Sequence, residues 1–333
     1  MLSYQDFCSV ENLYEEWLKY RRGKKDRSDV MEFERNLEEN LSALSDDLSR
    51  DRYRHGSYCE FYVRDPKFRC IHKAAVRDRV AHQALYSALA PVFERCFIYD
   101  SYSSRVGKGT RAARERARKF IIASSKNYRR EVWVLHGDVA KYFDSVNHNL
   151  LLEMIGRKIA GHKNFMSIIR RIISSYQTKP GIGMPLGNLT SQLFANVYLH
   201  ELDIFVKHIL RVKKYTRYND DFFIVSDNPD YLRECFLAIR RFASARLKLD
   251  LPDEKVSCKR LSDGVDVLGE VFYPWGVVPR ARLKRRALAA AKRFSSRRGT
   301  TSWRSVVSYL GLLKKTRSYF LSEKLRLAAT IKN

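Results

Sequence analysis

This 333-residue sequence lacks a long apolar segment. Apolar residues make up 45% of the chain, but they are dispersed in short amphipathic runs, and none approaches the roughly 18 residues of a membrane-spanning helix. The start of the chain shows no signal-peptide pattern. Cysteines number only six, without a Cys-x-x-Cys pair or zinc-like spacing to the eight histidines. We therefore expect a soluble, cytoplasmic protein without membrane contact, whose thiols stay reduced.

Acidic residues are scarce beside basic ones. The chain has 63 Lys and Arg against 37 Asp and Glu, a formal net charge of +26, and the pI is near 9.9. The basic excess is spread along the chain, and several clusters are interleaved with aromatic residues. This composition predicts a polynucleotide partner. A helical DNA-binding protein would have the same charge, but it would not need the carboxylate-bearing strands that follow.

Two adjacent carboxylates interrupt a stretch of β-branched and aromatic residues at 215–225. The pattern predicts a tight hairpin with Asp220 and Asp221 at its tip. Burying both carboxylates without a counter-charge would cost several kcal/mol, and a bound Mg²⁺ would remove that conflict. In isolation, the segment is explained equally well by an ordinary Asn-Asp turn.

A second carboxylate ends an apolar strand upstream. Residues 131–138 predict a strand ending at Asp138, followed by a helix with Ser145 or Asn147 as its N-cap. One aspartate at a strand end and two at a hairpin tip suit a two-metal site, where ions about 3.5–4 Å apart assist phosphoryl transfer. We expect Asp144 to be solvated or to cap the helix.

The region between these segments contains a glycine- and proline-bearing loop at 181–189. Its backbone can approach a ligand closely, and a helix is expected to start at Thr190 or Ser191. Further along, the sequence predicts a helix over 230–247, one strand from Val265 to Tyr273, and cationic helices from Ala281 onward. Apolar positions at helical spacing predict that residues 1–50 are helical too.

The order of motifs resembles a known family. The motifs are Asp138 with Phe143, then Pro185-Leu186-Gly187-Asn188-Leu189-Thr190-Ser191-Gln192, then Tyr218-x-Asp220-Asp221, then Val265-Asp266-Val267-Leu268-Gly269. Together they resemble bacterial and phage reverse transcriptases of the group II intron-like superfamily, most of all those of diversity-generating retroelements. The resemblance runs from about residue 67 to the C-terminus, and its most specific part is the Gly-Asn-Leu-Thr-Ser-Gln string.

The resemblance implies an α+β right-hand polymerase fold. Its parts would be an N-terminal helical extension (1–66), fingers (67–130), a palm of antiparallel sheet plus helices interleaved with the fingers (131–279) and a small basic helical thumb (280–333).

The resemblance also assigns roles to individual residues. Asp138, Asp220 and Asp221 would be catalytic and, with Val139, would hold two Mg²⁺ ions. The residues implied to bind dNTP are Arg69, Arg79, Phe143, Leu186 and Lys255, and Leu186 would also affect fidelity. Those implied to bind nucleic acid are Arg105, Lys108, Gly187, Asn188, Gln192 and Tyr218.

Several of these residues also have a plain structural interpretation. Lys255 could be a surface lysine beside two acidic residues, Phe143 a core side chain, and Leu186 a filler beneath its loop. Any single arginine could be a solvated charge. Two departures from the family pattern stand out: Asn219 occupies a position that is usually apolar or small, and 70–74 lacks a proline that related enzymes often carry nearby.

The implied function is an RNA-directed DNA polymerase that copies a template-repeat RNA into error-prone, adenine-mutagenised cDNA, diversifying a target gene by mutagenic retrohoming. Its partners would be a structured template RNA, a primer, dNTPs and a small, basic, helical, oligomeric accessory variability protein. Retron, group II intron and antiviral reverse transcriptases would share the palm and remain alternatives. A non-catalytic RNA-binding protein on a polymerase fold is the other alternative, and the retained aspartates argue against it.

Overall fold

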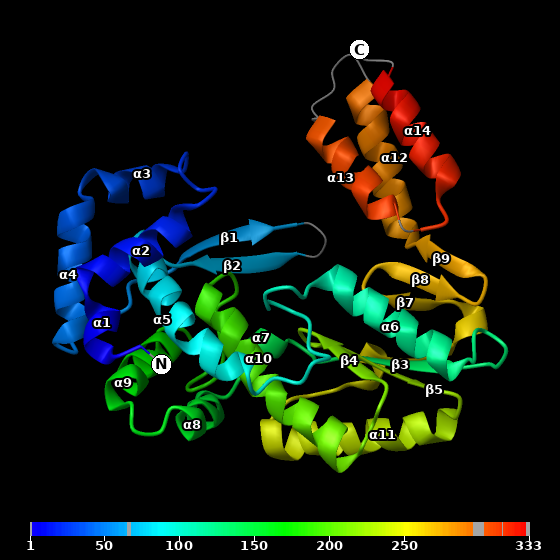
Figure 1. The fold of residues 1–333 in the computed structure, drawn as a ribbon, viewed down its shortest axis with the longest axis horizontal. Helices are drawn as coiled ribbons and strands as arrows, with labels where there is room; N and C mark the ends of the chain where they lie inside the picture. Colours follow the sequence, from blue (N-terminus) through cyan, green and yellow to red (C-terminus); the bar gives the residue numbers. More distant parts are fainter. Residues whose placement is uncertain (1, 65–67, 296–302, 315, 331–333) are drawn as a thin grey trace.

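The computed structural model describes residues 2–64, 68–295, 303–314 and 316–330 and shows a mixed α+β protein (Figure 1). The chain begins with four helices: α1 (Tyr4–Cys8), α2 (Val10–Arg21), α3 (Ser28–Arg35) and α4 (Leu37–Ser49). Leu13, Trp17 and Leu44 of their apolar stripe are fully buried. The helical prediction for residues 1–50 is therefore confirmed.

A two-stranded hairpin follows these helices. Strand β1 (Cys59–Val63) pairs antiparallel with β2 (Arg69–Lys73), and Phe61 lies opposite Ile71. The helical extension expected over residues 1–66 therefore also contains strand β1, whose aromatic and β-branched residues favour an extended conformation. The predicted boundary at residue 67 lies outside the described residues.

A four-stranded antiparallel sheet forms the centre of the molecule, in the order β4-β5-β3-β6. Its strands are β3 (Trp133–Asp138), β4 (Tyr215–Tyr218), β5 (Asp221–Ser226) and β6 (Val256–Arg260). The register places Asp138 opposite Asp221 and Gly137 opposite Phe222. The predicted strand ending at Asp138 and the predicted acidic hairpin are both confirmed.

Helices cover both faces of this sheet (Figure 1). On one face α6 (Thr110–Ser124) packs Phe120 and Ile121 against a core that includes Val134 and Phe223. On the other, α11 (Pro229–Phe242) packs against Leu135 and Ile224. The predicted helix over 230–247 is confirmed, although its last five residues form the π-turn η2 (Ala243–Leu247).

Several of the remaining helices connect successive strands of this sheet. They are α5 (Val76–Glu94), α7 (Tyr142–Ser145), α8 (His148–Lys158), α9 (Lys163–Ser174), α10 (Leu189–Ile204) and the short turns η1 (Phe205–Ile209), η3 (Asp253–Lys255) and η4 (Leu261–Asp263). Asn147 caps α8 by accepting the Leu150 N–H at 3.1 Å, as predicted. The helix predicted from Thr190 or Ser191 is α10, which starts one residue earlier.

The outer edge of β4 is covered by the segment before α6. The Arg217 N–H donates to the Asp100 carbonyl at 2.9 Å, and the Tyr102 N–H donates to the Arg217 carbonyl at 2.9 Å. At the other edge of the sheet, Lys259 and Arg260 of β6 are exposed. The sheet therefore ends in a covered strand on one side and a charged strand on the other.

The C-terminal part contains a small sheet and a helical bundle. The sheet comprises β7 (Val265–Val267), β8 (Glu270–Tyr273) and β9 (Gly276–Pro279). The single strand predicted from Val265 to Tyr273 is wrong, because Leu268 and Gly269 adopt φ of 50° and 93° and reverse the chain. Helices α12 (Ala281–Ser295), α13 (Trp303–Leu313) and α14 (Tyr319–Thr330) then form a bundle that stands apart from the central sheet (Figure 1). Among the described helices, none is long and apolar enough to cross a membrane.

Candidate active site

Three carboxylates lie at one end of the central sheet. Asp138 is the last residue of β3, Asp221 is the first residue of β5 directly opposite, and Asp220 lies in the turn between β4 and β5. Burial, and then the negative charges of Asp221 and Asp138, raise the pKa of the Asp220 carboxyl well above its usual range. The cluster therefore favours a cation.

The local sequence explains how these carboxylates are presented. A Cβ atom on Gly137 would lie 2.3 Å from Cζ of Phe222, so only glycine lets that ring pack across the strand behind Asp138. At the hairpin tip, Asn219 adopts φ of 57°, a left-handed conformation that asparagine tolerates better than apolar residues. Its side-chain amide donates to Oδ1 of Asp220 at 3.0 Å. This geometry accounts for a polar residue between Tyr218 and Asp220.

Two basic side chains contact the cluster. Nζ of Lys255 donates to Oδ2 of Asp138 at 2.7 Å, and this hydrogen bond raises the pKa of the Lys255 ammonium. Nε2 of His136 lies 2.8 Å from Oδ1 of Asp221, and its ring stacks on Phe223. His136 was missed by the sequence interpretation, although it stands two residues before Asp138 and so shares its face of the strand.

The donor set fits Mg²⁺. Carboxylate oxygens are the hard ligands that Mg²⁺ prefers, and a few of them suffice when substrate phosphates and water complete the octahedral shell. The Lys255 ammonium pairs with one of the three carboxylates, that of Asp138. The Val139 side chain is apolar and 2% exposed, so this residue could join only through its main-chain carbonyl.

The loop at 181–188 is hydrogen-bonded to strand β2. The His72 N–H donates to the Leu186 carbonyl at 2.9 Å, and the Asn188 side chain donates to the His72 carbonyl at 3.0 Å. Gly187 has φ of 110°, and a Cβ atom there would lie 2.6 Å from Cγ2 of Ile71. Both motif residues, Gly187 and Asn188, thus hold the loop against the β1–β2 hairpin.

Phe143 joins the other side of the same loop. Its carbonyl accepts the Met184 N–H at 2.8 Å, and its half-buried ring packs edge-on against Tyr142. Tyr218 pairs with Asp221 across the β4–β5 hairpin, and Gln192 is exposed on α10. Asp144 is exposed on α7, in agreement with the expectation that it is solvated.

Most of the basic residues singled out from the sequence have protein partners in the structure. Arg79 pairs with Asp29 and lies over the Tyr20 ring. The Arg105 guanidinium donates to Glu94 and to the carbonyls of Ile98 and Ser101. Lys108 donates to the Tyr99 carbonyl, whereas Arg69 is exposed on β2. The structure does not bring Arg79, Arg105 or Lys108 to the carboxylates.

Comparison with known proteins identifies the family of the chain. A family model described as "Reverse transcriptase (RNA-dependent DNA polymerase)" matches residues 64–312. The chain therefore belongs to the reverse transcriptase family.

The sequence identity to individual relatives is low. Protein YkfC of Escherichia coli (strain K12) is 28% identical over 171 residues, which cover 49% of this chain and 44% of YkfC. Group II intron-encoded protein LtrA of Lactococcus lactis subsp. cremoris is 27% identical over 179 residues, 52% of this chain and 27% of LtrA. The chain thus spans less than half the length of these curated relatives.

Solved telomerase structures share the fold. A telomerase from Candida albicans, in complex with a telomeric RNA fragment, has a TM-score of 0.52 and 9% identity, covering 89% of this chain and 61% of its own. Apo telomerase from Candida tropicalis has a TM-score of 0.52 and 14% identity, covering 83% of this chain and 56% of its own. At these identities the similarity concerns the fold alone.

Proposed function

We propose that this chain is an RNA-directed DNA polymerase whose active site is formed by Asp138, Asp220 and Asp221. The observation that carries the proposal is the position of these three carboxylates at one end of the central sheet, in a chain of the reverse transcriptase family. The central sheet would be the palm, the β1–β2 hairpin with α5 and α6 the fingers, and α12–α14 the thumb.

Each residue of the site would have its own role in the reaction. Two Mg²⁺ ions, when bound, would stabilise the charge that develops on the attacking and leaving oxygens. Asp138 and Asp220 would hold them, and Asp221, which already contacts His136, would assist. Lys255 would be released from Asp138 toward the leaving pyrophosphate, whose charge its ammonium would offset. Phe143 and Leu186 would shape the nucleotide pocket from two sides of one loop.

Within the family, we propose the role of a diversity-generating retroelement enzyme. The support is the motif string from Pro185 to Gln192, with aliphatic Leu186 where accurate reverse transcriptases often carry glutamine. Glutamine can hydrogen-bond near an incoming nucleotide, whereas leucine can only pack. The template would be the element's structured RNA, and a small basic helical accessory protein would help to hold it.

Primer extension on poly(A) RNA with oligo(dT) tests the polymerase. We expect Mg²⁺-dependent synthesis by the wild type and none above background by Asp138→Asn or Asp220→Asn, because transition-state charge stabilisation is lost while remote contacts remain. Asp144→Asn is the matched control, since Asp144 is an exposed aspartate of the same segment, and it should extend normally. Synthesis by either of the first two variants at saturating Mg²⁺, with RNA affinity intact, would reject the site.

A second candidate role follows from the similarity to LtrA, whose name describes a group II intron-encoded protein. Sequencing cDNA made on a defined RNA template separates the two roles. Errors concentrated opposite template adenine would favour the retroelement, and equal errors at all four bases would favour an intron-type or other accurate enzyme.

A further inference from the structure

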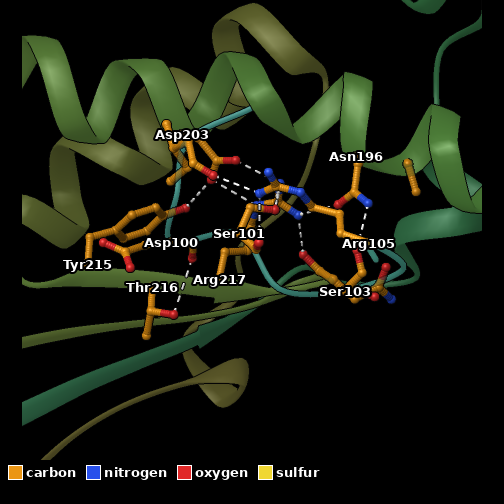
Figure 2. Close-up of polar contacts among 12 residues, drawn as sticks. Asp100, Ser101, Ser103, Arg105, Asn196, Asp203, Tyr215, Thr216 and Arg217 are labelled. Carbon is orange, nitrogen blue, oxygen red and sulfur yellow. Dashed lines mark hydrogen bonds and ion pairs between the residues drawn. The ribbon is translucent and has the colours of Figure 1, made fainter. Parts of the chain in front are cut away.

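A fully buried arginine lies directly before the acidic hairpin tip. Arg217 of β4 is 1% exposed, and its guanidinium forms a two-point ion pair with Asp203 of α10 (Figure 2). Nε lies 2.8 Å from Oδ1 and Nη2 lies 2.7 Å from Oδ2. Asp203 is 0% exposed and also accepts the Tyr215 hydroxyl at 2.7 Å. Both charges are therefore enclosed by protein.

The other N–H groups of Arg217 also have acceptors. Nη1 donates to the Asn219 carbonyl at 2.8 Å and to Oδ1 of Asn196 at 3.2 Å. Nη2 donates to Oγ of Ser101 at 3.1 Å. A guanidinium has five N–H donors, and here all five are used. The side chain is consequently held in one orientation by α10, the segment before α6, and the hairpin itself.

The bond to the Asn219 carbonyl links this network to the carboxylates. That oxygen belongs to the planar peptide unit between Asn219 and Asp220. Holding the oxygen in place therefore fixes the peptide plane next to the Cα atom that bears the Asp220 side chain. Asn219 also has φ of 57°, a conformation that is costly for a residue with a side chain. A buried donor on its carbonyl stabilises that conformation.

We propose that Arg217, itself held by Asp203, is a positioning residue that orients Asp220 for metal binding. The inference rests on the proposed function in one respect, that Asp220 is a metal ligand. Arg217 acts through the Asn219 peptide, and Asp203 acts one step further away, through Arg217. Arginine suits the position because a lysine ammonium cannot reach Asp203, Asn196, Ser101 and Asn219 in one planar fork.

The competing explanation is an ion pair that only stabilises the fold. Buried ion pairs can often be replaced by apolar residues of similar volume without loss of stability. The double variant Arg217→Met with Asp203→Leu therefore separates the two explanations, because it keeps the packing but removes the donor to Asn219. Arg217→Lys keeps a charge opposite Asp203 and removes the fork. Asn196→Ala is milder, since it leaves the ion pair in place.

Three measurements on the full chain test the role. Thermal unfolding reports the fold, calorimetric titration of nucleic-acid-free protein with Mn²⁺ reports the metal site, and single-nucleotide incorporation gives kcat and the KM for dNTP. For Arg217→Lys and the double variant we expect at least about tenfold weaker Mn²⁺ binding and about tenfold lower kcat, the effect of losing one well-placed hydrogen bond. The KM for dNTP should stay within about twofold, because Arg217 is too deeply buried to meet the nucleotide. Asn196→Ala should weaken Mn²⁺ binding by about threefold, because it removes one of the hydrogen bonds that hold the Arg217 guanidinium.

Arg157→Lys is the matched control, because Arg157 forms an exposed ion pair with Glu153 of α8 and Glu201 of α10. It should leave all three measurements unchanged. A folded Arg217→Lys or double variant with wild-type Mn²⁺ affinity and kcat would overturn the proposal. If both fail to fold, wild-type Mn²⁺ binding by Asn196→Ala would overturn it. A wild type that binds Mn²⁺ through Asp220 but extends no primer would reject the polymerase, while the Mn²⁺ titrations would still decide the role of Arg217.

Discussion

Mild acid should destabilise this protein through one buried histidine. His82 of α5 is 1% exposed, lies 2.9 Å from the ring of His55, and hydrogen-bonds the Thr190 hydroxyl on α10. Burial first, and then His55 and Arg79, lower the pKa of His82 from 6.5 to about 3. The nearby carboxylate of Asp78 is held by the Tyr53 hydroxyl and lies 3.9 Å from His55.

The sign and size of the effect follow from linkage. The unfolded chain takes up a proton at this position below pH 6.5, whereas the folded chain keeps His82 neutral down to about pH 3. The stabilisation is therefore complete above pH 6.5 and is lost progressively as the pH falls toward 3. Each unit within this window corresponds to about 1.4 kcal/mol, so the loss at pH 5 is about 2 kcal/mol.

Urea unfolding at pH 7 and pH 5 measures this loss. In His82→Asn the free energy of unfolding should fall by about 2 kcal/mol less between the two pH values than in the wild type, because contributions from the other groups cancel. His208→Asn, at an exposed histidine, serves as the control and should behave like the wild type. Equal pH dependence in the wild type and in folded His82→Asn would refute the reasoning.

Three further substitutions, one of them with a compensating second substitution, test the site. Phe143→Ala should let the enzyme incorporate rGTP beside dGTP by opening space next to C2′, whereas a purely structural phenylalanine would cost about 3 kcal/mol of stability on truncation. Leu186→Gln should lower misincorporation opposite template adenine by up to about tenfold, the effect of one added hydrogen bond, as measured by sequencing cDNA. Gly137→Ala should destabilise the fold by about 1–3 kcal/mol in urea, because its Cβ would lie 2.3 Å from the Phe222 ring. It should also slow synthesis, since Asp138 is the next residue, and Phe222→Leu should restore part of both losses.

Each of these expectations has a contrary result. An unchanged ratio of rGTP to dGTP in a folded Phe143→Ala would remove its role in sugar selection. An unchanged adenine error in an active Leu186→Gln would leave Leu186 as a packing residue. Wild-type stability of Gly137→Ala would mean that Phe222 can move aside without cost.

Local patterns in the sequence predicted the parts of the site correctly. A run of apolar residues ending at Asp138, a hairpin around Asp220, and the Asn147 cap each depend on residues that are close together in the chain. Lys255 could be proposed only from the family resemblance, since the 117 residues that separate it from Asp138 leave no local signal for their hydrogen bond.

The errors have identifiable physical causes. Nothing local distinguishes an arginine that binds phosphate from one that pairs with a carboxylate, so the ion pairs of Arg79 with Asp29 and of Arg105 with Glu94 could not be predicted. The reversal at Leu268 was missed because leucine rarely adopts positive φ. The pair of Arg217 with Asp203 depends on a strand packing against a helix, which composition alone does not encode.

The covered edge of β4 has a consequence for the protein in concentrated solution. A bare edge strand offers unpaired N–H and carbonyl groups on which a strand of another molecule can add, and such addition is a route to aggregation. Here the segment around Asp100 and Tyr102 occupies those groups on β4, while Lys259 and Arg260 place repelling charges along β6. Strand addition is therefore hindered at both edges of the central sheet, and molecules at high concentration can come close together without their sheets joining.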